Sequence, residues 1–349
     1  RGEAAFKPLY TIADVEAAMH LFKSIPYDTN FTICEGVTAR FRDAGHILGS
    51  AGISLEVLEN GKLTRCAFSG DIGRSNMPIL HDPNIPRDLD MLIMETTYGN
   101  RRHAAIADVE EELVQTVRTV MANGGKIIIP AFAVGRTQEL VYILHKLFNE
   151  NRISEIPIFI DSPLACNATD VFRDHPECFD RETNRIFLAD HEDPFGFGRL
   201  KYVHDIAESK NLNGITYPHI IISASGMAEG GRILHHLRNN VENPKNLILF
   251  VGYAAQETLA RKIIDGARTV KILGEEHSIK CKIKTMDAFS AHADTEELLN
   301  YAMITPPSKL QTVILVHGEK EQSLPFAATL ESKGYRKVLY PAAYETITI

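Results

Sequence analysis

Five polar residues in this sequence border strand-like apolar runs. They are His46 in DAGHILGS, Asp71 in FSGDIGR, Glu95 in METTYG, His292 in FSAHAD and His317 in VHGE. The runs before the last four are LTRCAF, MLIM, KIKTMDAF and TVILV. If these strands share one sheet, we expect the polar side chains to converge at one edge of it. Imidazole and carboxylate groups are ligands that zinc and similar cations prefer, so the pattern predicts a metallohydrolase.

We predict that His46, Asp71 and His317 hold the metal. Taken singly, each has a simpler explanation, because a lone loop histidine is more often structural and an aspartate after Ser-Gly usually shapes a turn. Because all three residues lie at strand ends, a shared metal site explains them better than three separate structural roles. Asp294 is left out, since the run DTEE that it begins is a helix capping box. His292 has no such explanation and is a candidate proton donor or phosphate ligand.

A second group of residues is suited to binding anions. The segment SASGMAEGGR (223–232) follows a predicted strand and opens a predicted helix, where free backbone N–H groups attract phosphate. FAVGR (132–136) repeats this pattern on a smaller scale, although a plain strand-to-helix turn explains it equally well. The predicted phosphate or RNA ligands are Ser225, Gly226, Gly230, Gly231, Arg232 and Arg136.

Composition narrows the class of protein. The chain has 349 residues, enough for two domains, and a net charge of −8, whereas proteins that coat nucleic acid are usually basic. A nucleic-acid substrate therefore requires local positive potential, partly from bound metal. The five cysteines are scattered without a CxxC pair, which argues against disulfides and favours a reducing cytoplasm. No apolar run is long enough to span a membrane.

The order of predicted elements indicates one domain inserted into another. An early helix and a hairpin around Asn60-Gly61 precede a buried strand, MLIME. From about residue 100, helices and strands alternate, which is typical of a parallel sheet covered on both faces. The hairpin-like pattern returns at about residue 282. We therefore expect residues 1–99 and 282–349 to fold together around an inserted α/β domain, 100–281.

Ten sequence motifs occur in a recognisable order along nearly the whole chain. They are DAGHILGSA, FSGDIGR, METTYGNR, PAFAVGRTQE, DSPLA, SASGMAEGGRILHHL, FVGYAAQETL, LGEE, FSAHAD and VHGE. The chain thereby resembles the β-CASP group of metallo-β-lactamase-fold nucleases, above all the bacterial RNA-processing branch related to the factor that cuts messenger-RNA 3′ ends. The resemblance implies an α/β protein with the metallo-β-lactamase αββα fold, incomplete at its N-terminus, and an inserted parallel-sheet β-CASP domain. It also implies two zinc ions per intact site and RNA bound between the domains.

The resemblance assigns a role to each of the five residues. His46 serves one zinc, His317 serves the second, and Asp71 bridges the two. Glu95 holds the site by hydrogen bonds, and His292 touches the scissile phosphate or its leaving oxygen. Histidine at position 317, where the DNA-processing branch typically has valine, favours RNA. The expected partner is RNA, not a membrane, and a homodimer remains open.

The chain departs from the family pattern at one point. The HxHxDH motif, which supplies four metal ligands upstream of the His46 motif, does not occur in these 349 residues. We interpret this as truncation and expect the polypeptide as written to hold metal poorly and cut little. The alternatives are a natural pseudo-enzyme acting as a non-catalytic RNA-binding subunit, a DNA nuclease of the same fold, and a small-ester or thioester hydrolase.

Overall fold

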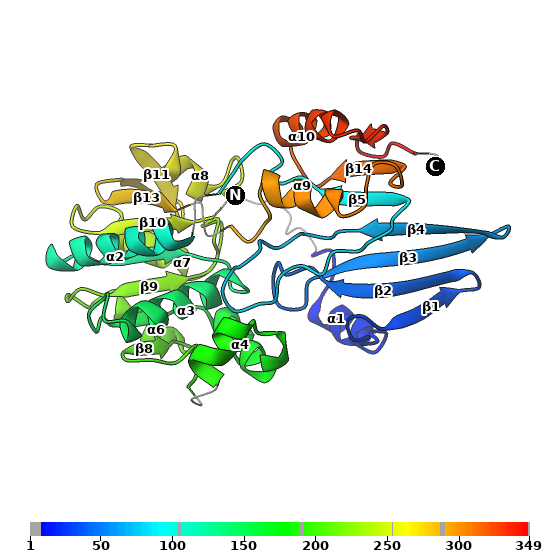
Figure 1. The fold of residues 1–349 in the computed structure, drawn as a ribbon. Coiled ribbons are helices and arrows are strands. Elements are labelled where there is room, and N and C mark those ends of the chain that lie inside the picture. The colour runs from blue at the N-terminus through cyan, green and yellow to red at the C-terminus, as the bar shows by residue number, and fades with distance from the viewer. Residues whose placement is uncertain (1–7, 104–105, 189–191, 253, 287–289, 348–349) are drawn as a thin grey trace.

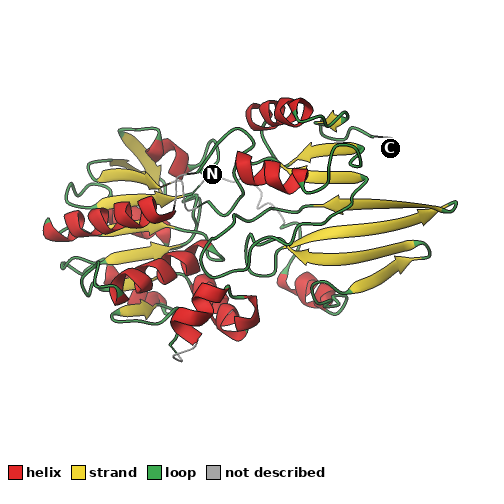
Figure 2. Cartoon of the chain, viewed as in Figure 1, coloured by secondary structure: helices red, strands yellow, loops and turns green. Residues whose placement is uncertain are grey.

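The computed structural model describes residues 8–103, 106–188, 192–252, 254–286 and 290–347. Two lobes lie side by side, each built around one β-sheet, and loops from both lobes meet between them (Figure 1). We name them the seven-stranded lobe and the six-stranded lobe after their sheets. Figure 2 shows helices gathered around the six-stranded sheet, whereas long strands make up much of the other lobe.

The sheet of the seven-stranded lobe has the order β1-β2-β3-β4-β5-β14-β15. Its first four strands form an antiparallel meander, and β4, β5, β14 and β15 run parallel. The strands are β1 (Asn30–Cys34), β2 (Val37–Asp43), β3 (Ala51–Glu59), β4 (Lys62–Phe68), β5 (Met91–Glu95), β14 (Thr312–Val316) and β15 (Val338–Leu339).

The predicted hairpin is confirmed between β3 and β4. Asn60 and Gly61 both have positive φ, 49° and 77°, the backbone geometry of the two-residue turns that match strand twist. The predicted buried strand MLIME is β5.

Two helices, α9 (Thr295–Met303) and α10 (Lys320–Ser332), pack on one face of this sheet. Leu92 and Met94 of β5 meet Leu298 of α9 and Phe326 of α10 in the core beneath them. A smaller buried cluster of Cys66, Met91 and Ile314 lies in the same lobe. The predicted early helix is α1 (Ile12–Met19), which has no buried residue.

The sheet of the six-stranded lobe is entirely parallel, as the sequence predicts, with the order β13-β10-β6-β9-β7-β8. Its central strands are buried on both faces, which explains their continuous apolar runs. The strands are β6 (Ile127–Pro130), β7 (Ile158–Ile160), β8 (Leu200–Tyr202), β9 (Ile220–Ser223), β10 (Leu247–Val251) and β13 (Lys282–Met286). A separate pair, β11 (Thr269–Ile272) and β12 (Glu275–Ser278), is antiparallel.

Helices cover both faces of this sheet, as Figure 1 shows. Alternate residues of one strand point to opposite sides, so Ile127 and Ile129 join one core cluster while Ile128 joins the other. The helices are α2 (Ile106–Ala122), α3 (Arg136–Asn149), α4 (Pro163–Asp174), α5 (Arg181–Thr183), α6 (Ile206–Leu212), α7 (Ile233–Asn240) and α8 (Leu259–Ile264). Short 3-10 and π turns, Pro176–Cys178 and Asn184–Leu188, flank α5.

One predicted boundary is wrong. The run KIKTMDAF was predicted to belong to the domain formed by residues 1–99 and 282–349. Its strand β13, however, pairs in parallel with β10 inside the six-stranded sheet. The physical reason is that β13 is an edge strand of this sheet, so its two exposed positions, Lys282 and Thr285, are polar. The inserted domain therefore extends past residue 281 to Met286. Residues 287–289, which end this run, lie outside the described part of the chain.

Two compositional predictions can be compared with the structure. All five cysteines are free thiols, in agreement with the expected absence of disulfides. Among the described residues, no helix is both long enough and apolar enough to cross a bilayer.

Candidate metal centre

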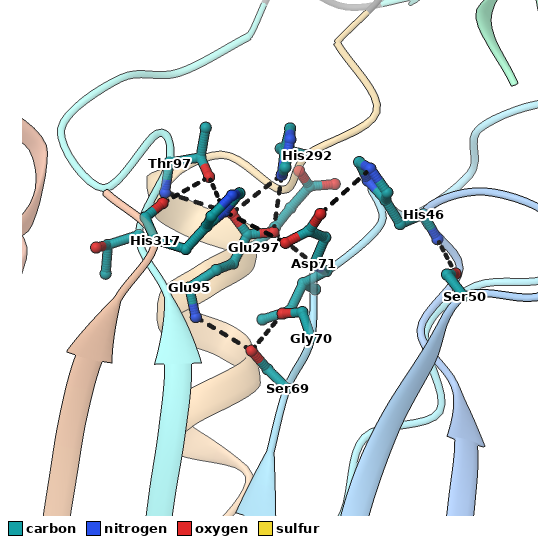
Figure 3. A network of polar contacts seen from close by, with 12 residues as sticks. His46, Ser50, Ser69, Gly70, Asp71, Glu95, Thr97, His292, Glu297 and His317 are labelled. Carbon is teal, nitrogen blue, oxygen red and sulfur yellow. Dashed lines mark hydrogen bonds and ion pairs between the residues drawn. The ribbon is translucent and has the colours of Figure 1, made fainter. Parts of the chain in front are cut away.

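The five predicted residues lie together at one edge of the seven-stranded sheet (Figure 3). Strands β4, β5 and β14 run parallel, so their carboxyl ends reach the same edge. Glu95 ends β5 and pairs in register with Val316, which ends β14. Asp71 lies in the loop after β4, and His317 directly follows β14. Parallel pairing thus brings together side chains from distant parts of the sequence.

His46 and His292 reach this edge from two further loops. His46 lies between β2 and β3, and His292 lies shortly before α9. Gly73 joins both loops to the one that carries Asp71: its N–H donates to the Ala44 carbonyl at 2.8 Å, and it forms an antiparallel bridge with His292.

The distances between these side chains are short. Asp71 lies between two histidines, with Oδ2 3.9 Å from Nε2 of His46 and Oδ1 3.3 Å from Nδ1 of His317. The His292 ring centroid is 4.4 Å from that of His46 and 5.8 Å from that of His317. The structure therefore brings all of the predicted ligands into one cluster.

Glu95 is the buried anchor of this cluster, with 1% of its surface exposed. Its carboxylate accepts hydrogen bonds from the backbone N–H of Ile72 at 2.5 Å and of Thr97 at 3.3 Å. Nδ1 of His292 lies 3.0 and 3.1 Å from its two oxygens. Burial alone would raise the pKa of Glu95, but the hydrogen bonds and charge of His292 outweigh it, so this pKa lies below its usual range.

The pKa values of His46 and His292 are shifted in opposite directions. Burial, and then the neighbouring His292 ring, lower the pKa of His46 below its ordinary value. Burial also acts to lower the pKa of His292, but the hydrogen bond and charge of Glu95 prevail, and this pKa is raised. His46 therefore favours the neutral ring that binds metals, and His292 favours the protonated ring that can donate a proton.

Glycines allow the loops to approach so closely. A Cβ added to Gly73 would lie 1.9 Å from the carbonyl oxygen of Gly45, and one added to Gly70 would lie 2.8 Å from that of Ala51. Gly45 itself has a positive φ of 64°. The glycines that flank His46 and Asp71 are thus required by backbone contact between their two loops.

The sequence interpretation missed several hydroxyl groups that hold the ligands in place. The Thr97 hydroxyl donates to the His317 carbonyl at 3.1 Å and lies 3.3 Å from its Nδ1. Ser69 accepts from the Glu95 backbone N–H at 3.1 Å, and Ser50 accepts from that of His46 at 3.1 Å. Serine and threonine beside a strand end are too common to single out, although METTYG places Thr97 two residues after Glu95.

A cavity of about 560 Å³ opens beside the cluster. Both lobes contribute to its wall, because Met227 of the segment 223–232 faces the loops of the seven-stranded lobe across it. Its lining residues are Asp71, Thr97, Tyr98, Arg101, Met227, His292, His317, Gly318, Glu319 and Gln322.

The structure corrects the predicted role of Arg232. Its guanidinium pairs with the fully buried Asp161 at 2.7 Å and donates to the carbonyls of Val203 at 3.1 Å and His204 at 2.8 Å. It is therefore a structural cation here, committed to the interior of the six-stranded lobe rather than free to bind phosphate.

The same correction applies to Arg136, whose side chain is 7% exposed and pairs with Glu139 one helical turn away. The other predicted anion ligands form a compact loop. Ser225 donates from its N–H to the Gly230 carbonyl at 3.1 Å, and Gly231 has a positive φ of 80°. The roles predicted for Ser225, Gly226, Gly230 and Gly231 remain predictions.

The donor atoms of the cluster fit a divalent metal. Those of His46, Asp71 and His292 lie within 4.8 Å of one another, and so do those of Glu95, His292 and His317. Nδ1 of His46 is buried and has no hydrogen-bond partner among the described residues; metal ligation is one way to satisfy such an atom. His292, predicted as a proton donor or phosphate ligand and not as a metal ligand, belongs to both groups, although its Nδ1 faces Glu95.

Two family models match the chain. A "Beta-Casp domain" covers residues 137–263, and a "Zn-dependent metallo-hydrolase RNA specificity domain" covers residues 276–341. The second match contains both His292 and His317, and its description supports a metal cofactor.

Curated relatives match over most of the chain. The ribonuclease TTHA0252 of Thermus thermophilus is 34% identical, over 94% of this chain and 73% of its own length. An RNase J-like protein of Methanocaldococcus jannaschii is also 34% identical, over 92% and 73%. The transcription termination factor FttA of Pyrococcus horikoshii is 31% identical over 98% of this chain, which spans 53% of that relative.

The two matched domains and these relatives agree with the two lobes and with the cluster at the sheet edge. The chain belongs to the β-CASP family of metallo-β-lactamase-fold ribonucleases.

Proposed function

We propose that this protein is a zinc-dependent ribonuclease that hydrolyses RNA phosphodiester bonds in the cleft between its two lobes, in RNA processing or decay. The observation that carries the proposal is the convergence of His46, Asp71 and His317 on one cavity whose wall includes Met227 of the other lobe. The ribonuclease name of a relative with 34% identity supports RNA as the substrate.

His46, Asp71 and His317 would hold the zinc, because the two carboxylate oxygens of Asp71 face these two different histidines. When bound, zinc supplies Lewis-acid chemistry toward a phosphodiester. These residues orient the substrate phosphate against the cavity wall.

His292 provides the proton for the departing 3′-oxygen. Glu95 accepts from its Nδ1, which leaves Nε2 to face the substrate and favours the protonated ring. Because Glu95 is buried and bound to backbone N–H groups, it fixes the direction of the His292 ring and does not contact RNA.

The printed 349 residues contain no HxHxDH motif. Structural zinc sites usually have four protein ligands, and catalytic sites have three for each ion. We infer that these residues alone bind zinc weakly and cut slowly, so that activity rises with added zinc. The proposal includes a homodimer, which light scattering tests, and a cytoplasmic location.

The test compares single-stranded RNA and DNA of one sequence, incubated with the protein over a series of zinc concentrations. We expect RNA to be cut, DNA to remain intact, and Asp71→Ala to abolish cutting. Asp88→Ala is the matched control, because Asp88 is an exposed aspartate of the same lobe that pairs with Lys309. Cutting of both polymers would indicate a DNA nuclease, and RNA binding without cutting at any zinc concentration would indicate a non-catalytic subunit.

A further inference from the structure

We propose that Arg101 is a positioning residue that grips an RNA phosphate next to the one being cleaved. The proposal rests on the ribonuclease function argued above and adds a substrate contact to it. Arg101 is exposed and lines the same 560 Å³ cavity as Asp71, His292 and His317. It is the one arginine or lysine in the described lining of that cavity.

The backbone that carries Arg101 is fixed in place. Its N–H donates to the Tyr98 carbonyl at 3.1 Å, and its carbonyl accepts from the N–H of Thr295, the first residue of α9, at 2.9 Å. The Thr295 hydroxyl also donates to the Gly99 carbonyl at 2.8 Å. These bonds tie the turn after Glu95 to a helix of the core.

Helix α10 supports the same turn from its other side. The Gln322 side chain accepts from the N–H of Asn100 at 3.2 Å. A Cβ at Gly99 would lie 2.7 Å from the Gln322 carbonyl oxygen and 2.9 Å from Cβ of Phe326, so this turn packs directly on α10. Groups held on such a rigid support lose little entropy when they bind a ligand.

The guanidinium of Arg101 is available for a ligand. Within the described part of the chain, its side chain makes no hydrogen bond or ion pair, whereas Arg232 and Arg136 are committed to Asp161 and Glu139. A planar guanidinium binds phosphate through two parallel N–H donors. With a net charge of −8, the molecule needs such a local cation where the polyanion enters.

Arg102 is a natural control. It is the next residue in the sequence, but its side chain is 73% exposed, pairs with Glu296 at 3.2 Å, and does not line the cavity. Replacing either arginine changes the net charge equally, so only a position-specific contact distinguishes them.

The test measures binding without cleavage. Fluorescence anisotropy of a fluorescein-labelled single-stranded RNA is followed in EDTA over a series of salt concentrations, for the unaltered protein, Arg101→Gln, Arg101→Lys and Arg102→Gln. We expect Arg101→Gln to weaken binding about tenfold and to make the slope of log K against log salt shallower by about 0.7, the loss of one phosphate contact. Arg102→Gln should retain the slope and bind within about twofold. Arg101→Lys should retain the slope with intermediate affinity.

The outcomes separate the two proposals. If the unaltered protein binds RNA but Arg101→Gln matches it, or Arg102→Gln loses as much, the role of Arg101 is wrong and the ribonuclease proposal stands. If the unaltered protein binds no RNA in EDTA, the role of Arg101 is wrong, and the cleavage assay with zinc decides the ribonuclease proposal separately. Thermal melting of Arg101→Gln, expected to be unchanged because its side chain has no described partner, excludes misfolding as the cause.

Discussion

Glu95 and His292 form a partly buried charge pair whose strength depends on pH. Glu95 has a depressed pKa, so its stabilising contribution is present above its ordinary value of 4.5 and is lost as pH falls through the lower folded value. His292 has a raised pKa, so its contribution is present below its ordinary 6.5 and is lost as pH rises through the higher folded value.

We therefore expect the substitution His292→Asn to destabilise the metal-free protein most between about pH 4.5 and pH 6.5. The difference in melting temperature from the unaltered protein should shrink on both sides of this range. Differential scanning fluorimetry in EDTA across the acid and neutral range measures it. A difference that stays constant with pH would refute the pairing.

The backbone contact at Gly73 makes a second prediction at this scale. A methyl group there would overlap the Gly45 carbonyl at 1.9 Å, so Gly73→Ala should cost at least about 2–3 kcal/mol of unfolding free energy and weaken zinc binding. Gly230→Ala is the control, since a Cβ there meets nothing within 4 Å. Urea denaturation compares the two, and equal stability would contradict the steric argument.

A site residue could be predicted from the sequence when its place beside a strand was enough to identify it. Asp71 and His317 follow strands β4 and β14, and parallel pairing brings the ends of such strands to one edge of the sheet. His46 reaches the same edge from the loop between two antiparallel strands. Arg232 and Arg136 could not be assigned correctly, because a buried ion pair depends on carboxylates such as Asp161, which lies on another element. Arg101 was missed because an arginine in a turn is most often merely solvated.

At the scale of elements, pattern reasoning succeeded where one burial pattern had one cause. The isoleucine-rich central strands could only be buried on both faces, and the Asn60-Gly61 turn could only join a hairpin. The sheet to which β13 belongs was predicted wrongly, because an edge strand of a parallel sheet and a strand of an antiparallel sheet can both mix polar and apolar residues. Only its neighbour β10 distinguishes the two.

Asp161 joins three elements of the six-stranded lobe and predicts how that lobe responds to mutation. Directly after β7, it accepts hydrogen bonds from Ser209 of α6 at 2.6 Å, from His236 of α7 at 2.6 Å and from Arg232. Burial would raise the pKa of Asp161, but the hydrogen bonds from His236, Ser209 and Arg232 lower it. Its contribution is thus present at neutral pH and is lost as pH falls through the depressed value.

We expect Asp161→Asn to lower the free energy of unfolding by about 3–5 kcal/mol at neutral pH, because Arg232 would remain buried without its anion. The deficit should shrink in acid, where the native aspartate is protonated too. Urea denaturation at several pH values tests this, with the exposed Asp265→Asn as control. A deficit independent of pH would show that packing, not charge, is responsible.

At the scale of the whole molecule, one buried arginine feels charges from both lobes. Arg74, in the loop after β4, is 8% exposed, with Nε 3.8 Å from the Glu297 carboxylate of α9. Burial lowers the pKa of Arg74, and the charges of Glu297 and of Glu139, on α3 of the other lobe, act against it. Charges from both lobes thus act on the guanidinium of Arg74.

We predict that Arg74→Gln and Glu139→Gln are not additive. Each alone disturbs a buried set of charges, and the double variant should be more stable than the sum of the single effects implies, by about 0.5–3 kcal/mol. A double-mutant cycle in urea measures the coupling, with the exposed pair Arg102 and Glu296 as reference. Additivity within about 0.5 kcal/mol would mean that the lobes are electrostatically independent.

The position of the six-stranded lobe within the sequence affects the order in which the predicted metal ligands are synthesised. His46 and His317 lie on either side of the whole six-stranded lobe in the sequence, yet their side chains flank the same aspartate. Emerging from the ribosome, the chain carries His46 and Asp71 long before His317 exists. During synthesis, the side chains of His46 and Asp71 therefore cannot meet that of His317 until the whole six-stranded lobe between them has been made.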